Sequence, residues 1–155
     1  AGRGARRLPP MPCRASAGKP APPLRLLMRP IPPQVEAVAK QIVDAAFKVH
    51  CSLGPGLLET VYEQCMVHEI AKRKLQVRRQ VHVPIAYDGM KLETGLRVDL
   101  IVEDLLIVEI KAVETLLAVH RAQVLSYLKL TGLRLALLVN FCVPLIRDGI
   151  QRLAL

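Results

Sequence analysis

The sequence predicts a mixed α/β fold, in which helices pack on a single mixed β-sheet. Two changes of pattern support this prediction. Apolar residues recur every three or four positions within residues 34–74, as on the buried stripe of a helix, and then alternate every second position from residue 77, as on a half-buried strand. Later strands are apolar on both faces. Because 52% of the 155 residues are apolar and only 3% are aromatic, the core is expected to be aliphatic.

Residues 1–33 differ in composition from the rest of the chain and predict a disordered Pro/Arg-rich tail. This segment holds nine of the 12 prolines, seven of the 22 Lys and Arg, and none of the 13 Asp and Glu. Proline lacks a backbone N–H and fixes φ, so the segment cannot propagate a helix or a strand. The same prolines oppose the amphipathic helix of an organelle transit peptide. A second interpretation is that Met28 is the natural start.

The remaining residues, 34–155, are expected to form one domain with little net charge. They carry 15 basic and 13 acidic side chains, a net charge of +2 against +9 for the whole chain. Most of the positive charge therefore belongs to the tail, and it does not argue for nucleic-acid binding by the domain.

Two helices are expected first. The first covers residues 34–50, and the Gly54-Pro55-Gly56 run after it favours a turn. The second helix covers residues 57–74, with Glu59 and Glu63 in its first two turns, where negative charge suits the positive end of the helix dipole.

Three antiparallel strands follow. Residues 77–87 alternate, with Arg78, Gln80 and His82 on the exposed face, and Asp88-Gly89 is a hairpin turn signal. The strands at residues 92–102 and 105–112 are joined by a tight connection at residues 103–104. Because both are apolar on both faces, they are placed in the centre of the sheet.

The chain is then expected to continue through a helix, a buried strand and a short final element. The helix covers residues 115–130 and ends before Gly132, a good residue to follow a helix. The strand covers residues 134–141, and the final element covers residues 145–153. The four cysteines have neither zinc-ligand nor disulfide spacing, which favours a reducing, cytoplasmic setting. No apolar stretch is long enough to anchor the chain in a membrane.

Charged residues interrupt the two most apolar strands. Asp99 lies in one of them, and Glu109 and Lys111 lie two positions apart on one face of the other. Isolated buried charges are costly, so such residues must be paired or bound to a metal. A two-residue connection would place Asp99 opposite Val108, and a slip of one residue would place it opposite Glu109. In either register two carboxylates and a lysine converge.

This cluster is chemically suited to a hard divalent cation. Carboxylate oxygens favour Mg²⁺ or Mn²⁺, and the backbone carbonyl of Ile110 could add a third ligand. Lys111 could orient or activate a water that attacks a phosphodiester, while the metal polarises the phosphoryl oxygen. The alternative is a buried ion pair of Lys111 with Asp99 or Glu109 that serves the fold alone.

These residues resemble a known family. Asp99, followed by Glu109-Ile110-Lys111 on the next strand, resembles the D…(D/E)xK signature of the PD-(D/E)XK nuclease superfamily. Residues 56–63, GLLETVYE, are similar to the signature of the GxxExxY branch of that superfamily. Residues 107–114, 120–128 and 137–141 also resemble that branch, so the similarity extends over roughly residues 35–153.

The resemblance implies a restriction-endonuclease-like core of helix, three antiparallel strands, helix and strand, here with an extra N-terminal helix. It implies that Asp99 and Glu109 bind the metal and that Lys111 assists the attacking water. It also implies that Glu59 joins the metal shell and that Gln123 and Tyr127 lie beside the site.

Several of these residues have a second interpretation. Glu59 could simply complement the N-terminus of its helix. Tyr62 is expected to be a packing residue with a satisfied hydroxyl. His120, Gln123 and Tyr127 share one helical face, which could contact substrate or could make a polar contact between helix and sheet.

Two functions follow. The first is a Mg²⁺- or Mn²⁺-dependent nuclease, with DNA favoured over RNA as the substrate. The second is a non-catalytic regulatory module on the same fold that binds nucleic acid or protein, which the near-neutral domain favours. The basic residues at 72–74 and 78–79 are expected to be a solvated surface, and a phosphate contact is the alternative.

Overall fold

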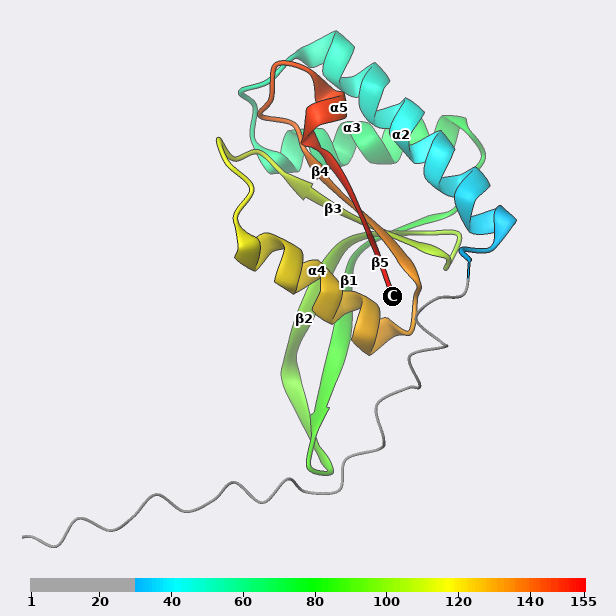
Figure 1. The fold of residues 1–155 in the computed structure, drawn as a ribbon, viewed down its shortest axis with the longest axis vertical. Coiled ribbons are helices and arrows are strands. Elements are labelled where there is room, and N and C mark those ends of the chain that lie inside the picture. The colour runs from blue at the N-terminus through cyan, green and yellow to red at the C-terminus, as the bar shows by residue number, and fades with distance from the viewer. Residues whose placement is uncertain (1–29) are drawn as a thin grey trace, which may run out of the picture.

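The computed structural model describes residues 30–155, which are arranged around a five-stranded sheet (Figure 1). The helices are α2 (Pro33–Leu53), α3 (Glu59–Lys72), α4 (Ala118–Thr131) and the single turn α5 (Ile146–Gly149). The strands are β1 (Val77–Tyr87), β2 (Met90–Val102), β3 (Leu106–Lys111), β4 (Leu135–Asn140) and β5 (Ile150–Ala154). The mixed α/β class predicted from the sequence is confirmed. Residues 1–29 of the predicted tail lie outside the described residues, and Pro33 already begins α2.

The strands lie side by side in the order β1-β2-β3-β4-β5. β1, β2 and β3 are antiparallel to one another, β4 runs parallel to β3, and β5 is antiparallel to β4. The parallel pair is connected through α4, since two parallel strands need a crossover between them. The core order expected from the sequence is therefore present, and the short final element consists of α5 and the edge strand β5.

Helices cover both faces of the sheet. On one face, α2 and α3 bury Ile42 and Met66 against residues such as Val108 of β3. On the other face, α4 buries Val124 and Leu128 against the opposite side of the same strands. In Figure 1, α2 and α3 lie on one side of the sheet and α4 on the other. Helices cover β3 and β4 on both faces. This explains why both strands are apolar throughout and why they lie inside the sheet.

The first helix is longer than expected, and the second begins later. α2 continues to Leu53, after which Gly54 adopts a left-handed φ of 69° and donates its N–H to the carbonyl of His50 at 2.8 Å. A glycine tolerates this conformation, so the helix ends there rather than at the earlier position expected from the pattern. α3 begins at Glu59, two residues after its expected start.

Tyr62 fastens the loop between these helices. Its hydroxyl donates to the carbonyl of Gly54 at 2.6 Å and accepts the N–H of Leu57 at 3.1 Å. Its ring is fully buried and stacks on Phe141 at a centroid distance of 4.3 Å. Tyr62 is thus a packing residue with a satisfied hydroxyl, as expected, and it holds the start of α3 in place.

The connection between β2 and β3 has three residues and not two. Val102 pairs with Leu106, and the N–H of Leu105 donates to the carbonyl of Val102 at 3.0 Å. Residues 103 and 104 both have a φ of 54°, so the chain turns with two left-handed residues before Leu105. The register with Val102 opposite Leu105 is therefore wrong, and the register slipped by one residue is found. None of the helices within residues 30–155 is long and apolar enough to cross a membrane.

Candidate active site

The slipped register aligns the two predicted metal-binding carboxylates. The last pair of the β2–β3 ladder is Leu100 with Val108, so the next step places Asp99 in line with Glu109. Here a side chain replaces the backbone carbonyl as the acceptor, because Oδ2 of Asp99 accepts the backbone N–H of Ile110 at 2.9 Å. The site thus forms where β2 stops pairing with β3.

Glu109 and Lys111 form a buried ion pair on β3. Nζ of Lys111 lies 2.8 Å from Oε1 of Glu109, and the Glu109 side chain is only 2% exposed. The second carboxylate oxygen, Oε2, is buried and has no hydrogen-bond partner among the described residues. A buried acceptor without a donor is unusual, since nearly all buried polar atoms are paired.

The carboxylates and the lysine shift one another's ionisation. Burial, together with the charge of Asp99, raises the pKa of Glu109 to about 7, because the hydrogen bond from Lys111 only partly offsets these two effects. Burial also raises the pKa of Asp99, although the N–H of Ile110 and the charge of Lys111 oppose the shift. For Lys111, burial favours the neutral form, but the hydrogen bond to Glu109 and the surrounding negative charges outweigh it and raise its pKa.

Glu59 reaches the same end of the sheet from α3. Its Oε1 accepts the N–H of Ala112, the residue after β3, at 3.2 Å. Its charge is among those that raise the pKa of Asp99 and of Lys111. Glu59 is also the first residue of α3, where a negative charge complements the helix dipole. The two roles considered for Glu59 are therefore compatible in one position.

Gln123 and Tyr127 meet on α4, next to the cluster. Nε2 of Gln123 donates to the hydroxyl of Tyr127 at 2.5 Å, and that hydroxyl donates to the carbonyl of Arg97 on β2 at 3.0 Å. Burial raises the pKa of Tyr127, and the charge of Glu109 adds to the shift. This polar contact between helix and sheet is one of the two roles considered for the pair, and it leaves a substrate contact as a prediction.

His120 occupies the first turn of α4. Its Nδ1 accepts the N–H of Leu117, the residue before the helix, at 3.1 Å. The side chain thereby satisfies one of the backbone donors that every helix N-terminus leaves unpaired. A contact between His120 and substrate stays a prediction.

Two polar residues that the sequence analysis did not place at the site belong to the cluster. Glu63 is 7% exposed and accepts Nε of Arg79 at 2.9 Å and Nε2 of Gln80 at 2.7 Å. The same Nε2 lies 3.4 Å from Oδ1 of Asp99. The sequence contained a signal for Glu63, which lies one turn after Glu59 and therefore on the same face of α3.

The sequence contained no such signal for Gln80. Alternation placed it with Arg78 and His82 on the exposed face of β1, and this expectation is wrong. Gln80 is partly buried and has a left-handed φ of 49° within the strand. A period of two holds only while the backbone stays extended, so the irregular residue turns its side chain toward the carboxylates.

The chemistry of the donor set fits a cation. Among the side chains that the structure describes, no three of His, Cys, Asp or Glu converge closely enough to hold a metal by themselves. The charge of Asp99 nevertheless acts on Glu109, and Oε2 of Glu109 is buried without a hydrogen-bond donor. Two carboxylates completed by backbone oxygen or water are an ordinary environment for Mg²⁺.

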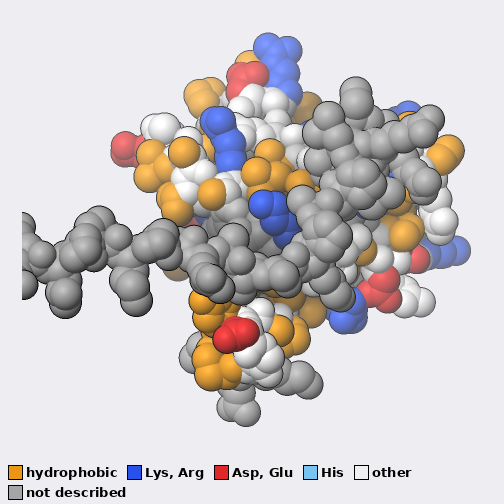
Figure 2. All heavy atoms as spheres, turned by 60° about the horizontal axis from the view of Figure 1, so that its bottom comes forward, with side chains coloured by type: hydrophobic (Ala, Val, Ile, Leu, Met, Phe, Trp, Pro, Cys, Tyr) orange, Lys and Arg blue, Asp and Glu red, His pale blue; other side chains and the backbone are white. Residues whose placement is uncertain are grey.

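Most of the predicted basic cluster is neutralised by neighbouring acids. Lys72 and Arg73 contact Glu69 at 3.0 and 2.8 Å. Of the two arginines on β1, Arg79 pairs with Glu63, and Arg78 pairs with the exposed carboxylate of residue 104. On the face drawn in Figure 2, the visible Lys and Arg side chains are dispersed and do not form a single patch. These residues therefore supply little long-range attraction for a polyanion.

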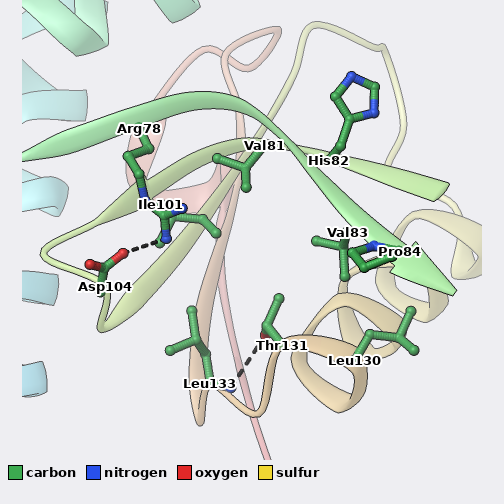
Figure 3. Close-up of a pocket in the computed structure, with 10 residues that line it drawn as sticks. All are labelled: Arg78, Val81, His82, Val83, Pro84, Ile101, Asp104, Leu130, Thr131 and Leu133. Atoms are coloured by element: carbon green, nitrogen blue, oxygen red, sulfur yellow. Dashed lines mark hydrogen bonds and ion pairs between the residues drawn. The ribbon is translucent and has the colours of Figure 1, made fainter. Parts of the chain in front are cut away.

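A separate groove of about 610 Å³ lies between β1 and the C-terminal end of α4 (Figure 3). Its walls are mainly apolar, with an ion pair between Arg78 and Asp104 at one end. None of the clustered carboxylates lines this groove. The candidate site is therefore defined by its charged side chains and not by this pocket.

Comparison with known proteins gives one match. Residues 36–153 of the chain match the family model of the PD-(D/E)XK nuclease superfamily. The match covers nearly all of the described residues, including every residue of the cluster. Neither a curated protein nor a solved structure matches the chain.

Proposed function

Because this chain belongs to the PD-(D/E)XK nuclease superfamily, we propose that it is a nuclease that hydrolyses phosphodiester bonds with Mg²⁺ or Mn²⁺. One observation carries the proposal. Glu109 is buried next to Asp99, and its Oε2 has no donor among the described residues, although Lys111 pairs with the other oxygen. Burying two carboxylates with a single lysine is costly unless a further cation joins them.

Asp99 and Glu109 would hold the cation, with the backbone carbonyl of Ile110 as a third ligand. When bound, a divalent cation polarises a phosphoryl oxygen and lowers the pKa of a water molecule. Glu59, which is fixed to the end of β3 through Ala112, would extend the acidic shell on the side of α3.

Lys111 would orient the attacking water and stabilise negative charge on the phosphate. The raised pKa of Lys111 keeps it protonated at neutral pH, so it acts as a hydrogen-bond donor and not as a base. Its side chain is 14% exposed, so it lies closer to solvent than Glu109 does. The Lys111 ammonium can therefore contact a substrate while it stays close to the Glu109 carboxylate.

We also propose a branch of the superfamily, a substrate and a location for this chain. The hydrogen bonds of Tyr62 and the position of Glu59 give the Gly-x-x-Glu-x-x-Tyr segment a structural purpose, which supports membership of the GxxExxY branch. Gln123 and Tyr127 would contact substrate from α4, with His120 at the start of the same helix. DNA is the favoured substrate, and the cytoplasm is the expected location.

A second function is favoured by a specific observation. Oε1 of Glu109 is paired with Lys111, and Oδ2 of Asp99 is paired with the N–H of Ile110. These contacts would also serve a non-catalytic module in which the charged cluster only fixes the fold. Calorimetric titration separates the two functions. An absence of Mg²⁺ and Mn²⁺ binding, together with strong destabilisation on removing Lys111, favours the module.

Replacing Asp99 with asparagine is expected to reduce hydrolysis by at least about 10²-fold. Partners of metal ligands are worth about 10- to 100-fold in affinity or activity, and a direct ligand is expected to be worth more. The asparagine side chain keeps an oxygen for the N–H of Ile110, so the fold should be retained. The assay compares cleavage of labelled single- and double-stranded DNA and RNA in Mg²⁺, in Mn²⁺ and in EDTA.

The matched control is Asp148→Asn, which changes an exposed carboxylate of α5 in the same way. The control should cleave at the wild-type rate. Wild-type cleavage by Asp99→Asn, or equal cleavage in EDTA, would contradict the proposed site.

A further inference from the structure

Gln80 has an unfavourable backbone conformation in the middle of a strand. Arg79 pairs with Leu100 and Val81 pairs with Val98, but Gln80 between them has no partner in the β1–β2 ladder. Its φ of 49° lies in the left-handed region, which side chains with a Cβ rarely adopt. An unfavourable conformation of this kind persists only where the surroundings hold it in place.

The left-handed residue turns two consecutive side chains toward one acceptor. Neighbouring residues of a regular strand point to opposite faces, so Arg79 and Gln80 could not both reach α3 from an extended backbone. Here Nε of Arg79 donates to one oxygen of Glu63 at 2.9 Å, and Nε2 of Gln80 donates to the other at 2.7 Å. The irregularity thus binds β1 to α3 through a single carboxylate.

The Gln80 amide also reaches the proposed metal site. Its Nε2 lies 3.4 Å from Oδ1 of Asp99, whose Oδ2 is held by the N–H of Ile110. Both oxygens of Asp99 are therefore oriented, one from β3 and one from β1. Because Nε2 lies between the carboxylates of Glu63 and Asp99, a flipped amide would place its oxygen against two negative groups. The orientation of the amide follows from this charge pattern.

The other end of the amide has no partner. Oε1 of Gln80 is buried and accepts no hydrogen bond among the described residues, as is also true of Oε2 of Glu109. These are the two unpaired buried oxygens among the described side chains, and both belong to the same cluster. A folding role alone would not need an acceptor without a donor, whereas a site that takes up a cation or its bound water would use one.

We propose that Gln80 is a positioning residue of the metal site. Its left-handed backbone brings the amide between Glu63 and Asp99, where the amide separates two like charges and fixes the Asp99 carboxylate. The inference rests on the proposed function for the identity of the ligand, a divalent cation. It goes beyond that function by giving Gln80 and Glu63 a defined task.

The test compares Gln80→Gly and Gln80→Asn with the wild-type chain. Glycine relieves the left-handed backbone and removes the amide, and asparagine tolerates that backbone but is one methylene shorter. Both variants should remain folded. The lost hydrogen bond to Glu63 lowers the midpoint of unfolding in urea, and in Gln80→Gly the relief of the left-handed backbone offsets part of that loss. Both should bind Mn²⁺ about 10- to 100-fold more weakly in titrations followed by electron paramagnetic resonance, as expected for loss of a group that orients a metal ligand.

The control is His82→Asn, on the exposed side of the same strand, which should bind Mn²⁺ as the wild type does. A Gln80→Gly variant with wild-type Mn²⁺ affinity would overturn the proposal. So would variants in which the unfolding midpoint falls and Mn²⁺ affinity is retained, because that is the result of a purely structural role.

Amide hydrogen exchange of Ile110 separates this proposal from the proposed function. If Gln80 fixes Asp99, the N–H that Asp99 accepts should exchange faster in Gln80→Gly than in the wild type, with or without metal. The amide of Leu137 in β4 should be unchanged. A wild-type chain that binds no Mn²⁺ would refute the metal site, whereas unchanged exchange of Ile110 would refute the positioning by Gln80.

Discussion

Replacing Lys111 with alanine is expected to reduce Mg²⁺-dependent hydrolysis by about 10²- to 10³-fold, the usual cost of removing one hydrogen-bond donor that stabilises charge in the transition state. The lysine is the one cation in contact with Glu109, at 2.8 Å, within the described residues. Its removal also leaves a buried carboxylate without a cationic partner. Stability at pH 8 should therefore fall by about 3–5 kcal/mol. Cleavage assays and urea unfolding measure the two effects.

Two further variants separate catalysis from folding. Lys111→Arg keeps a positive charge beside Glu109 and should stay folded, but a planar guanidinium does not replace a compact ammonium, so cleavage should still fall. Lys129→Ala removes an exposed lysine from α4 and should change neither property. Full cleavage by folded Lys111→Ala would show that Lys111 does not act on the water.

Replacing Glu109 with glutamine is expected to abolish cation binding and to remove a pH dependence of stability. The folded pKa of Glu109 is about 7, above its usual value of 4.5, so the folded state binds more protons than the unfolded state between these values. Without metal, the contribution of Glu109 to the free energy of unfolding should consequently be greatest below about pH 4.5. It should fall by about 3 kcal/mol as the pH rises through 7.

This pH window is distinct from that of Glu69, a carboxylate with several cationic partners. Salt bridges with Arg73 and Lys72 lower the pKa of Glu69 to about 2, so its contribution is lost only as the pH falls below about 4.5. Urea unfolding in EDTA from pH 5 to pH 8 therefore excludes Glu69, and the comparison of Glu109→Gln with the wild type separates Glu109 from Asp99, whose pKa is also raised. Over that range the stability of Glu109→Gln relative to wild type should rise by about 2.5 kcal/mol.

The control for this experiment is Glu114→Gln, an exposed residue after β3. It should follow the wild-type pH profile. Parallel profiles of the wild type and Glu109→Gln would mean that the Glu109 carboxyl does not titrate in this range. Retained Mg²⁺ stabilisation of Glu109→Gln would exclude it as a ligand, since a ligand that binds only the folded state raises the free energy of unfolding.

The sequence predicted the elements better than the contacts between them. Periodicity reports which face of an element is buried, so the order of helices and strands and the central position of β3 could be expected from it. The convergence of Asp99, Glu109 and Lys111 followed from the high cost of isolated buried charge. Local pattern and composition suffice for both of these expectations.

Register and irregular backbone could not be expected in the same way. Whether Asp99 lies opposite Val108 or Glu109 depends on the length of one turn. That turn has left-handed residues at 103 and 104, and neither is a glycine, so the sequence carries no signal for this backbone conformation. Gln80 reaches the cluster because its own backbone is left-handed within the strand. Without that irregularity, alternation places this polar side chain on the solvent-facing side. Such positions are fixed by partners far away in sequence, here Glu63 and Asp99.

The proposed nuclease depends above all on the binding of a catalytic divalent cation by the buried carboxylates of β2 and β3. The most direct measurement is the anomalous scattering of Mn²⁺ in crystals of the chain grown or soaked with that ion. We expect a single strong peak between Asp99 and Glu109, next to the carbonyl of Ile110, with Lys111 on the open side. Crystals that show no peak there at saturating Mn²⁺, with the Glu109–Lys111 ion pair intact, would contradict the metal site.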